Sequence, residues 1–159
     1  MSQFLFIKNA SQLLTLKGFS LRPAVKEEMN QLSMIENGAI LMENGLIIAV
    51  GPTEDVEREY REQLKLAKII DASGKIVLPG LVDPHTHLVY TGSREDEFNM
   101  RLNGATYMDI MNSGGGIYAT TSKTRAASEE ELYAESLKRL DLFLLHGVTT
   151  VEAKSGYGL

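Results

Sequence analysis

The sequence has no cysteine, only three histidines among its 159 residues, and no long apolar run. Without cysteine, neither a disulfide scaffold nor a thiolate metal site can form. No apolar stretch approaches the roughly 20 residues that span a bilayer, so we expect no membrane segment. The N-terminus lacks the basic region and the long apolar core of a signal peptide, which favours a cytoplasmic protein.

Positive charge is also scarce. The formal net charge is -5, and lysine and arginine form no cluster, so the sequence argues against a nucleic-acid partner. A hydrophobic content of 43% and a charged content of 23% are typical of a globular protein. The length suits one ordinary domain, or one small domain and part of another.

Residues 1–78 have the pattern of a small β-rich domain. We expect strands at residues 4–8 and 13–16, a loop over residues 18–36 and a surface helix over residues 53–66. Asn44-Gly45 lies between two β-rich runs and predicts a type I′ hairpin. A second hairpin is expected to turn at Ser73-Gly74. About six short, mostly antiparallel strands predict part of a β-sandwich.

Residues 79–159 have a different pattern, that of βα units. A strand over residues 81–87 precedes a long loop over residues 89–103, a short helix over residues 106–112 and a glycine cluster at residues 114–116. Ser128 and Glu131 predict a capping box for a helix that ends at His146-Gly147. A strand over residues 148–153 follows. Strand, helix and strand in this order predict two parallel strands and the α/β fold class.

The strand over residues 81–87 carries the main chemical signal. Side chains alternate along a strand, so His85 and His87 point to the same side. Converging neutral imidazoles are good ligands for zinc or iron. The alternative is an exposed strand that happens to carry two histidines; the apolar lead-in and the glycine-rich region that follows disfavour it. Asp83 is expected to orient or pack near a ligand.

Two further residues follow the carboxyl ends of the strands, where side chains that do chemistry on such sheets lie. Arg94 could hold a carboxylate through two parallel hydrogen bonds, or be a solvated charge paired within its own charged run. Tyr157 lies between two glycines and could meet a ligand, or pack on a helix. Glycines 114–116 are expected to form a tight bend near this site.

The predicted site is incomplete. A catalytic zinc site needs about three protein ligands. The remaining histidine, His146, lies at the opposite end of the sheet. We therefore expect these residues to hold half of a site and an incomplete barrel, with the general acid or base beyond Leu159 and the catalytic residues unknown.

Five blocks of sequence resemble the amidohydrolase superfamily and, within it, the imidazolonepropionase family: residues 79–89, 92–95, 114–117, 124–128 and 152–159. The resemblance implies a metal-dependent (β/α)8 TIM barrel over residues 79–159, preceded over residues 1–78 by strands of a small β-sandwich domain. It covers only the N-terminal part of the family's length.

The resemblance also implies roles for particular residues. His85 and His87 would bind one transition metal, zinc or iron. Arg94 would meet the propionate carboxylate of the substrate, 4-imidazolone-5-propanoate, and Tyr157 would contact substrate and product. The implied reaction opens the ring to N-formimino-L-glutamate in L-histidine degradation, and a homodimer is left open.

Two alternatives stay open. One is another cyclic amidohydrolase or a deaminase of the same superfamily. The other is a non-catalytic half-domain that needs a partner chain, because unpaired strand edges attract other chains.

Overall fold

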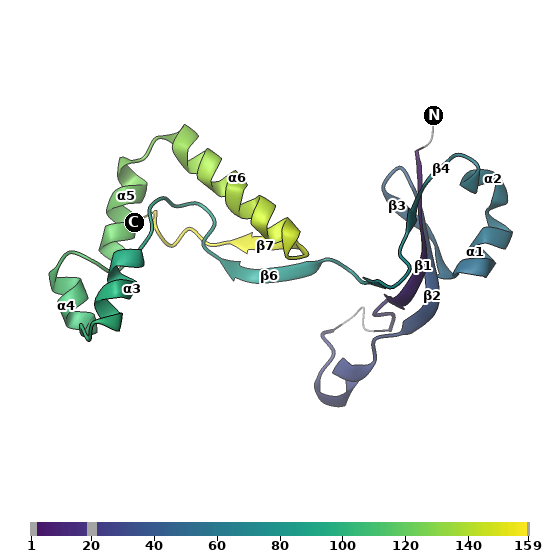
Figure 1. Cartoon of the computed structure of the whole chain (residues 1–159), viewed down its shortest axis with the longest axis horizontal. Helices are drawn as coiled ribbons and strands as arrows, with labels where there is room; N and C mark the ends of the chain where they lie inside the picture. Colours follow the sequence, from purple (N-terminus) through teal and green to yellow (C-terminus); the bar gives the residue numbers. More distant parts are fainter. Residues whose placement is uncertain (1–2, 19–21, 159) are drawn as a thin grey trace. The chain divides into compact units, whose positions relative to one another are not determined.

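The computed structural model describes residues 3–18 and 22–158 (Figure 1). The chain divides into two compact units, Met1–Pro79 and Gly80–Leu159, and each is described by itself. The loop expected over residues 18–36 falls partly outside the described residues, at positions 19–21. In the described part of the chain, no helix has both the length and the apolar character that crossing a membrane requires.

Unit 1 is built on one mixed sheet of five strands. The central strand β1 (Phe4–Leu14) pairs antiparallel with β2 (Met34–Glu43), which pairs antiparallel with β3 (Leu46–Pro52). On its other side β1 pairs parallel with β4 (Ala67–Asp71) and with β5 (Ile76–Val77). The second sheet of a sandwich is not among the described residues, so the β-sandwich stays a prediction.

The prediction of two strands before residue 17 is wrong, because β1 is continuous from Phe4 to Leu14. Its register shifts between Ile7 and Ala10, and Asn9 takes a φ of 57°. The backbone N–H of Asn9 donates to Thr53 Oγ1 at 3.0 Å instead of to a neighbouring strand. A bulge of this kind interrupts the side-chain alternation while the strand continues.

The second predicted hairpin is also wrong, because β4 and β5 do not pair with each other. The Asp71 carboxylate accepts from Ser73 N at 3.0 Å, and Ala72 N donates to the Lys8 carbonyl at 2.8 Å. These bonds hold the turn against the bulge of β1. The chain therefore continues along β1 in the same direction instead of reversing.

The hairpin at Asn44-Gly45 is confirmed. Asn44 and Gly45 have φ values of 51° and 83°, as both central residues of a type I′ turn require. The loop expected before it is partly wrong, since residues 34–36 belong to β2 and a 3₁₀ helix, η1, spans Lys26–Asn30.

Two short helices, α1 (Thr53–Glu59) and α2 (Arg61–Leu64), replace the single helix expected over residues 53–66. The break falls at Tyr60, whose φ of -110° is not helical. Val56 of α1 packs into the main core of unit 1 with residues of β1 and β2: Phe4, Phe6, Ala39 and Leu41. Unit 1 is thus a sheet with helices packed against one face.

Unit 2 contains the predicted βα arrangement. Strand β6 (Leu81–Thr86) pairs parallel with β7 (Val148–Ala153), and helix α6 (Glu129–Leu145) contacts β7 and lies along the strand pair (Figure 1). Gly147, with a φ of 81°, ends α6 as expected. Between β6 and α6 come α3 (Glu95–Leu102), α4 (Tyr107–Asn112) and α5 (Ile117–Ala126).

Helix α3 corrects the loop expected over residues 89–103. Its first turn holds Glu95, Asp96 and Glu97, and carboxylates are favourable at a helix N-terminus. The apolar start of β6 is exposed in this chain, with Val82 64% exposed.

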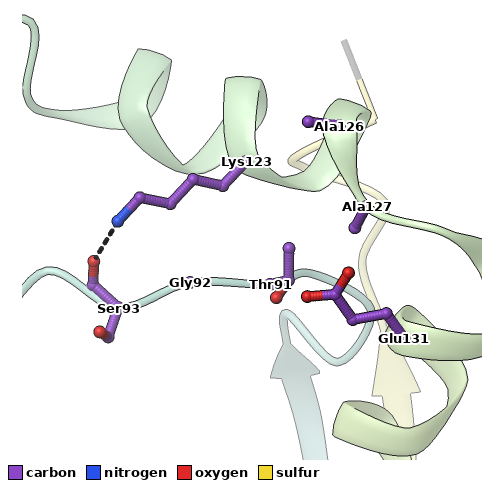
Figure 2. Close-up of a pocket in the computed structure, with 7 residues that line it drawn as sticks. All are labelled: Thr91, Gly92, Ser93, Lys123, Ala126, Ala127 and Glu131. Atoms are coloured by element: carbon purple, nitrogen blue, oxygen red, sulfur yellow. Dashed lines mark hydrogen bonds between the residues drawn. The ribbon is translucent and has the colours of Figure 1, made fainter.

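The predicted capping box of α6 forms only in part. Ser128 is the N-cap and its side chain accepts from Glu131 N at 3.2 Å. The described contacts include no return bond from Glu131, whose carboxylate instead faces a pocket (Figure 2). Helix α5 was not expected at all.

Candidate active site

The carboxyl ends of β6 and β7 meet at one edge of their sheet. Thr86 is in register with Ala153, and Lys154 N donates to the Thr86 carbonyl at 2.8 Å. Asp83 Oδ1 accepts from His85 N at 3.0 Å, so its carboxylate supports the backbone that carries the histidines. The loop after β7 brings Tyr157 to the loop after β6.

His85 and His87 lie together, with ring centroids 5.6 Å apart and an interplanar angle of 76°. Two imidazoles that share a tetrahedral metal at 2.0–2.1 Å would have centroids roughly 5 Å apart. The Nδ1 atom of His87 is buried, and no hydrogen-bond partner for it lies within the described part of the chain. Both observations fit a pair of metal ligands.

The metal site is nevertheless partial. No group of three His, Asp, Glu or Cys side chains that could hold a metal forms within residues 3–18 and 22–158. His146, the remaining histidine, is at the C-terminus of α6, where its Nδ1 lies 2.8 Å from the Leu142 carbonyl. It is not brought to His85 and His87.

An aromatic chain continues from His87. The Tyr157 ring lies 4.8 Å from the His87 ring, and the Tyr90 ring lies 5.4 Å from the Tyr157 ring in an edge-on arrangement. Gly156 makes the first contact possible, since a Cβ at that position would come within 2.2 Å of His87 Cε1. The backbone at residue 156 therefore fixes how closely Tyr157 and His87 approach.

Arg94 is held by a carboxylate of its own helix. Its Nε and Nη2 donate to Glu97 Oε2 at 2.8 and 2.6 Å. This bonding raises the pKa of Arg94 and holds the pKa of Glu97 below its usual range, with the hydrogen bond as the main cause in both. Glu97 Oε1 accepts from Gly116 N at 2.8 Å. The glycine bend thus binds an anion supplied by the chain itself and orients Arg94.

One pocket of about 320 Å³ brings three of the four predicted site residues together. His87, Arg94 and Tyr157 line it, with Tyr90, Gly92, Ser93 and Thr120. His85 is not in its lining but lies beside His87. A guanidinium, an imidazole and a phenol that face one small pocket can hold an anionic, planar, polar molecule.

A larger pocket of about 400 Å³ lies between α5 and the segment Thr91 to Ser93, with Lys123 donating to the Ser93 carbonyl at 3.2 Å (Figure 2). None of the predicted site residues lines it. We place the candidate site in the smaller pocket, because that is where the two substrate-binding candidates and a metal-ligand candidate meet.

Sequence reasoning missed Tyr90 and Thr120. Tyr90 lies three residues after His87, so its place on the loop at the strand end could have suggested it. The pairing of Arg94 with Glu97 bears out the alternative that Arg94 is paired within its own charged run, although the helix that places Glu97 three residues away was not predicted. Thr120 is 4% exposed and comes from the unexpected α5, so no sequence signal pointed to it.

Comparison with known proteins assigns the chain to a family. The model of the amidohydrolase family matches residues 68–156, more than half of the chain. The chain belongs to the amidohydrolase family. The model of a bacterial imidazolonepropionase-like composite domain also matches, over residues 38–62 of this amidohydrolase.

Individual proteins with high sequence identity to this chain are named imidazolonepropionase. The chain is 66% identical over 155 residues to an imidazolonepropionase from Geobacillus sp. (strain WCH70), covering 98% of this chain and 37% of that protein. It is 64% identical over 159 residues to the imidazolonepropionase of Brevibacillus brevis, covering all of this chain and 38% of that protein. The chain thus spans little more than a third of the length of these curated relatives.

Solved structures confirm the fold class. E. coli guanine deaminase matches with a TM-score of 0.53 at 18% identity, over 95% of this chain and 29% of that chain. Ochratoxinase from A. niger matches with a TM-score of 0.52 at 19% identity, over 99% of this chain and 27% of that chain. At these identities the matches show the fold alone, and they bear out the α/β fold class predicted from the sequence.

Proposed function

We propose that this chain supplies the N-terminal half of the active site of a cytoplasmic imidazolonepropionase. The reaction is hydrolysis of the cyclic amide C–N bond of 4-imidazolone-5-propanoate, which gives N-formimino-L-glutamate in L-histidine degradation. The observation that carries this proposal is the shared pocket of His87, Arg94 and Tyr157. Identities of 64–66% to proteins named imidazolonepropionase support it.

His85 and His87 would hold the metal, zinc or iron. Their ring separation and the unpartnered Nδ1 of His87 are suited to that role. Such a metal supplies Lewis acidity toward a carbonyl oxygen. Other ligands would have to come from outside the described residues, because no third ligand joins the two histidines there.

Arg94 would bind the propionate carboxylate of the substrate. A guanidinium has five N–H donors, and Glu97 takes only one from Nε and one from Nη2. The Arg94 side chain is 42% exposed, so its remaining donors can reach a ligand in the pocket. Glu97 keeps the guanidinium plane fixed before the substrate arrives, which lowers the ordering cost of binding.

Tyr157 would position the ring. Its side chain packs against His87, and its hydroxyl can donate or accept a hydrogen bond. The described lining of the pocket includes no carboxylate that could transfer a proton. We therefore assign the general acid or base to residues outside this chain, and we expect the 159 residues alone to show no turnover.

The test is a chimaera in which this chain replaces the matching 155 residues of the Geobacillus imidazolonepropionase. Its hydrolysis of 4-imidazolone-5-propanoate is measured beside that of the intact relative. We expect turnover within about tenfold of the relative, and loss of at least about 100-fold in kcat/KM for Arg94→Ala, because a charged hydrogen-bonded pair is removed.

The matched control is Arg101→Ala, which removes an arginine of the same helix outside this pocket. It should leave kcat/KM within about twofold, as is usual for exposed charges. An unchanged rate in Arg94→Ala would contradict the proposal. Turnover of guanine in place of the imidazolone would favour a deaminase, and no turnover of either would favour a non-catalytic half-domain.

A further inference from the structure

Arg139 of α6 binds the backbone of the loop that follows β6. Its Nη1 donates to the Leu88 carbonyl at 3.0 Å and to the Tyr90 carbonyl at 2.8 Å. The side chain is 20% exposed, so both bonds lie largely out of water. Hydrogen bonds from a charged donor are stronger than neutral ones, and they fix two alternate residues of an otherwise irregular segment.

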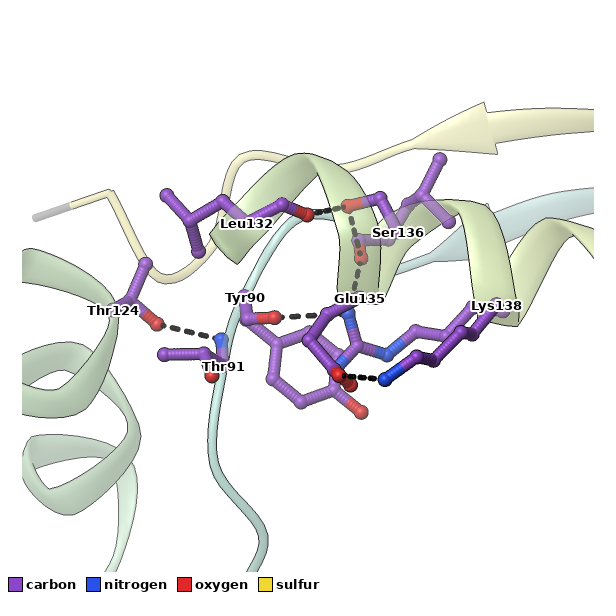
Figure 3. A network of polar contacts seen from close by, with 9 residues as sticks. Tyr90, Thr91, Thr124, Leu132, Glu135, Ser136 and Lys138 are labelled. Atoms are coloured by element: carbon purple, nitrogen blue, oxygen red, sulfur yellow. Dashed lines mark hydrogen bonds and ion pairs between the residues drawn. The ribbon is translucent and has the colours of Figure 1, made fainter. Parts of the chain in front are cut away.

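The same guanidinium also stacks on the Tyr90 ring. Its central carbon lies 3.8 Å from the ring centroid, well within the range of a cation–π contact. Arg139 thus holds Tyr90 at two points, the backbone carbonyl and the face of the ring. The only acidic partner near Arg139 in the described residues is Glu135, at 3.9 Å, and Glu135 is bonded more closely to Lys138, at 2.6 Å (Figure 3).

Tyr90, which Arg139 holds in place, contacts the aromatic side chains of the pocket. Its ring contacts Tyr157 at 5.4 Å, and Tyr157 contacts His87 at 4.8 Å. Tyr90 also lines the pocket with Gly92, Ser93 and Arg94, which continue the same loop. Packed side chains of this kind carry a displacement from one residue to the next.

We propose that Arg139 is the positioning residue of the substrate pocket. It acts through Tyr90 and through the backbone of residues 88–90, and sets where Tyr157 and Arg94 meet the substrate. A simple ion pair with Glu135 would not require an arginine, whereas a planar cation whose Nη1 donates to two carbonyls while its face stacks on a ring does. The proposal rests on the proposed function for its kinetic part only.

The kinetic test compares Arg139→Met with Lys138→Met in the chimaera. Both remove one positive charge from adjacent positions of α6 and keep an unbranched side chain, but the Lys138 side chain is 71% exposed and, among the described residues, pairs only with Glu135. For Arg139→Met we expect KM to rise roughly tenfold with kcat changed less than twofold, since substrate positioning is lost but the reacting groups remain. Lys138→Met should match the wild type.

Three measurements distinguish positioning from a merely structural role. Arg139→Lys should show a smaller rise in KM than Arg139→Met, because it keeps the charge but not the planar guanidinium. Tyr90→Leu should raise KM similarly, and the double variant Arg139→Met/Tyr90→Leu should be no worse than either alone, because the two residues act as one unit. Amide exchange of residues 88–93 should accelerate in Arg139→Met and not in Lys138→Met.

An unchanged KM with a lower melting temperature and a lower kcat would overturn the proposal, since that result indicates fewer folded molecules. Additive effects in the double variant would overturn it as well. If the wild-type chimaera itself shows no turnover, the proposed function fails, and the amide exchange of residues 88–93 still decides whether Arg139 positions the loop.

Discussion

Gly156 offers the sharpest test of the histidine pair as a metal site. A Cβ at this position would lie 2.2 Å from His87 Cε1 and 2.7 Å from His87 Nδ1. Carbon atoms pack at about 3.5–4.0 Å, so in Gly156→Ala the imidazole or the loop must retreat by about 1.3 Å or more. Gly156 does not take a positive φ, so the change tests steric contact and not backbone strain.

A displacement of that size exceeds the tolerance of a metal–ligand bond, which is about 0.2 Å. We therefore expect the affinity of the chimaera for zinc to fall roughly 10- to 100-fold in Gly156→Ala, the range for changes that disturb the orientation of a ligand. The assay is competition for zinc against a chelating dye, with the folded fraction checked by circular dichroism.

Gly158→Ala is the matched control in the same loop. Its Cβ would meet only the Ser155 carbonyl at 3.5 Å, an ordinary contact, so zinc affinity should stay within about twofold. Equal zinc affinities in the wild type and Gly156→Ala would refute the reasoning, because His87 would then not be held in place by the backbone of residue 156.

Two further changes test the supports of the site and the packing of unit 1. Arg94 is the main cause of the lowered pKa of Glu97, and this lowered pKa stabilises the fold at pH values above the unfolded-state pKa of about 4.3. The stabilisation is lost as the pH falls through the folded-state pKa. Glu97→Gln lacks this carboxylate, so its melting temperature should fall less than that of the wild type as the pH is lowered. Thermal melts of wild type and variant from pH 7 to pH 3 measure the difference, and coincident profiles would exclude the pairing. Gly38→Ala would place a Cβ 2.5 Å from the Cβ of Leu13, which is 2% exposed, and should cost about 1–3 kcal/mol of unfolding free energy by overpacking. Gly51→Ala, with Val56 Cγ2 at 3.8 Å, should cost much less in the same urea titration, and equal losses would contradict the packing.

The sequence was most informative where one residue type dictates a local conformation. Asn44-Gly45 predicted its hairpin because both residues accept a positive φ, and Gly147 predicted the end of α6 for the same reason. The parallel pair β6–β7 followed from the order of strand, helix and strand.

Two of the failures share a physical cause, since both depended on contacts between residues distant in sequence. The turn at Ser73-Gly74 looks like a hairpin locally, but bonds from Ala72 to Lys8 and from Gly74 to Ser11 Oγ direct the chain parallel to β1. The continuous β1 depends on Thr53, which satisfies the bulged Asn9 from 44 residues away.

In the candidate site, too, local features could be predicted from the sequence and contacts between distant residues could not. The strand period predicted His85 and His87 on one side, and the rings do lie together, although β6 ends at Thr86 and its register shifts between Asp83 and Thr86. The roles of Tyr90 and Arg139 could not be predicted, because Arg139 is 51 and 49 residues from the two carbonyls that it binds. The metal and substrate roles of His85, His87, Arg94 and Tyr157 stay predictions.

The most direct measurement of the central claim is product analysis in ¹⁸O-labelled water. The chimaera is incubated with 4-imidazolone-5-propanoate, and the products are identified by mass spectrometry. Hydrolysis of the ring C–N bond predicts N-formimino-L-glutamate that carries one solvent oxygen in its new carboxylate, and no such product from His87→Ala. Unchanged substrate with the wild-type chimaera, or equal labelled product from His87→Ala, would contradict the account.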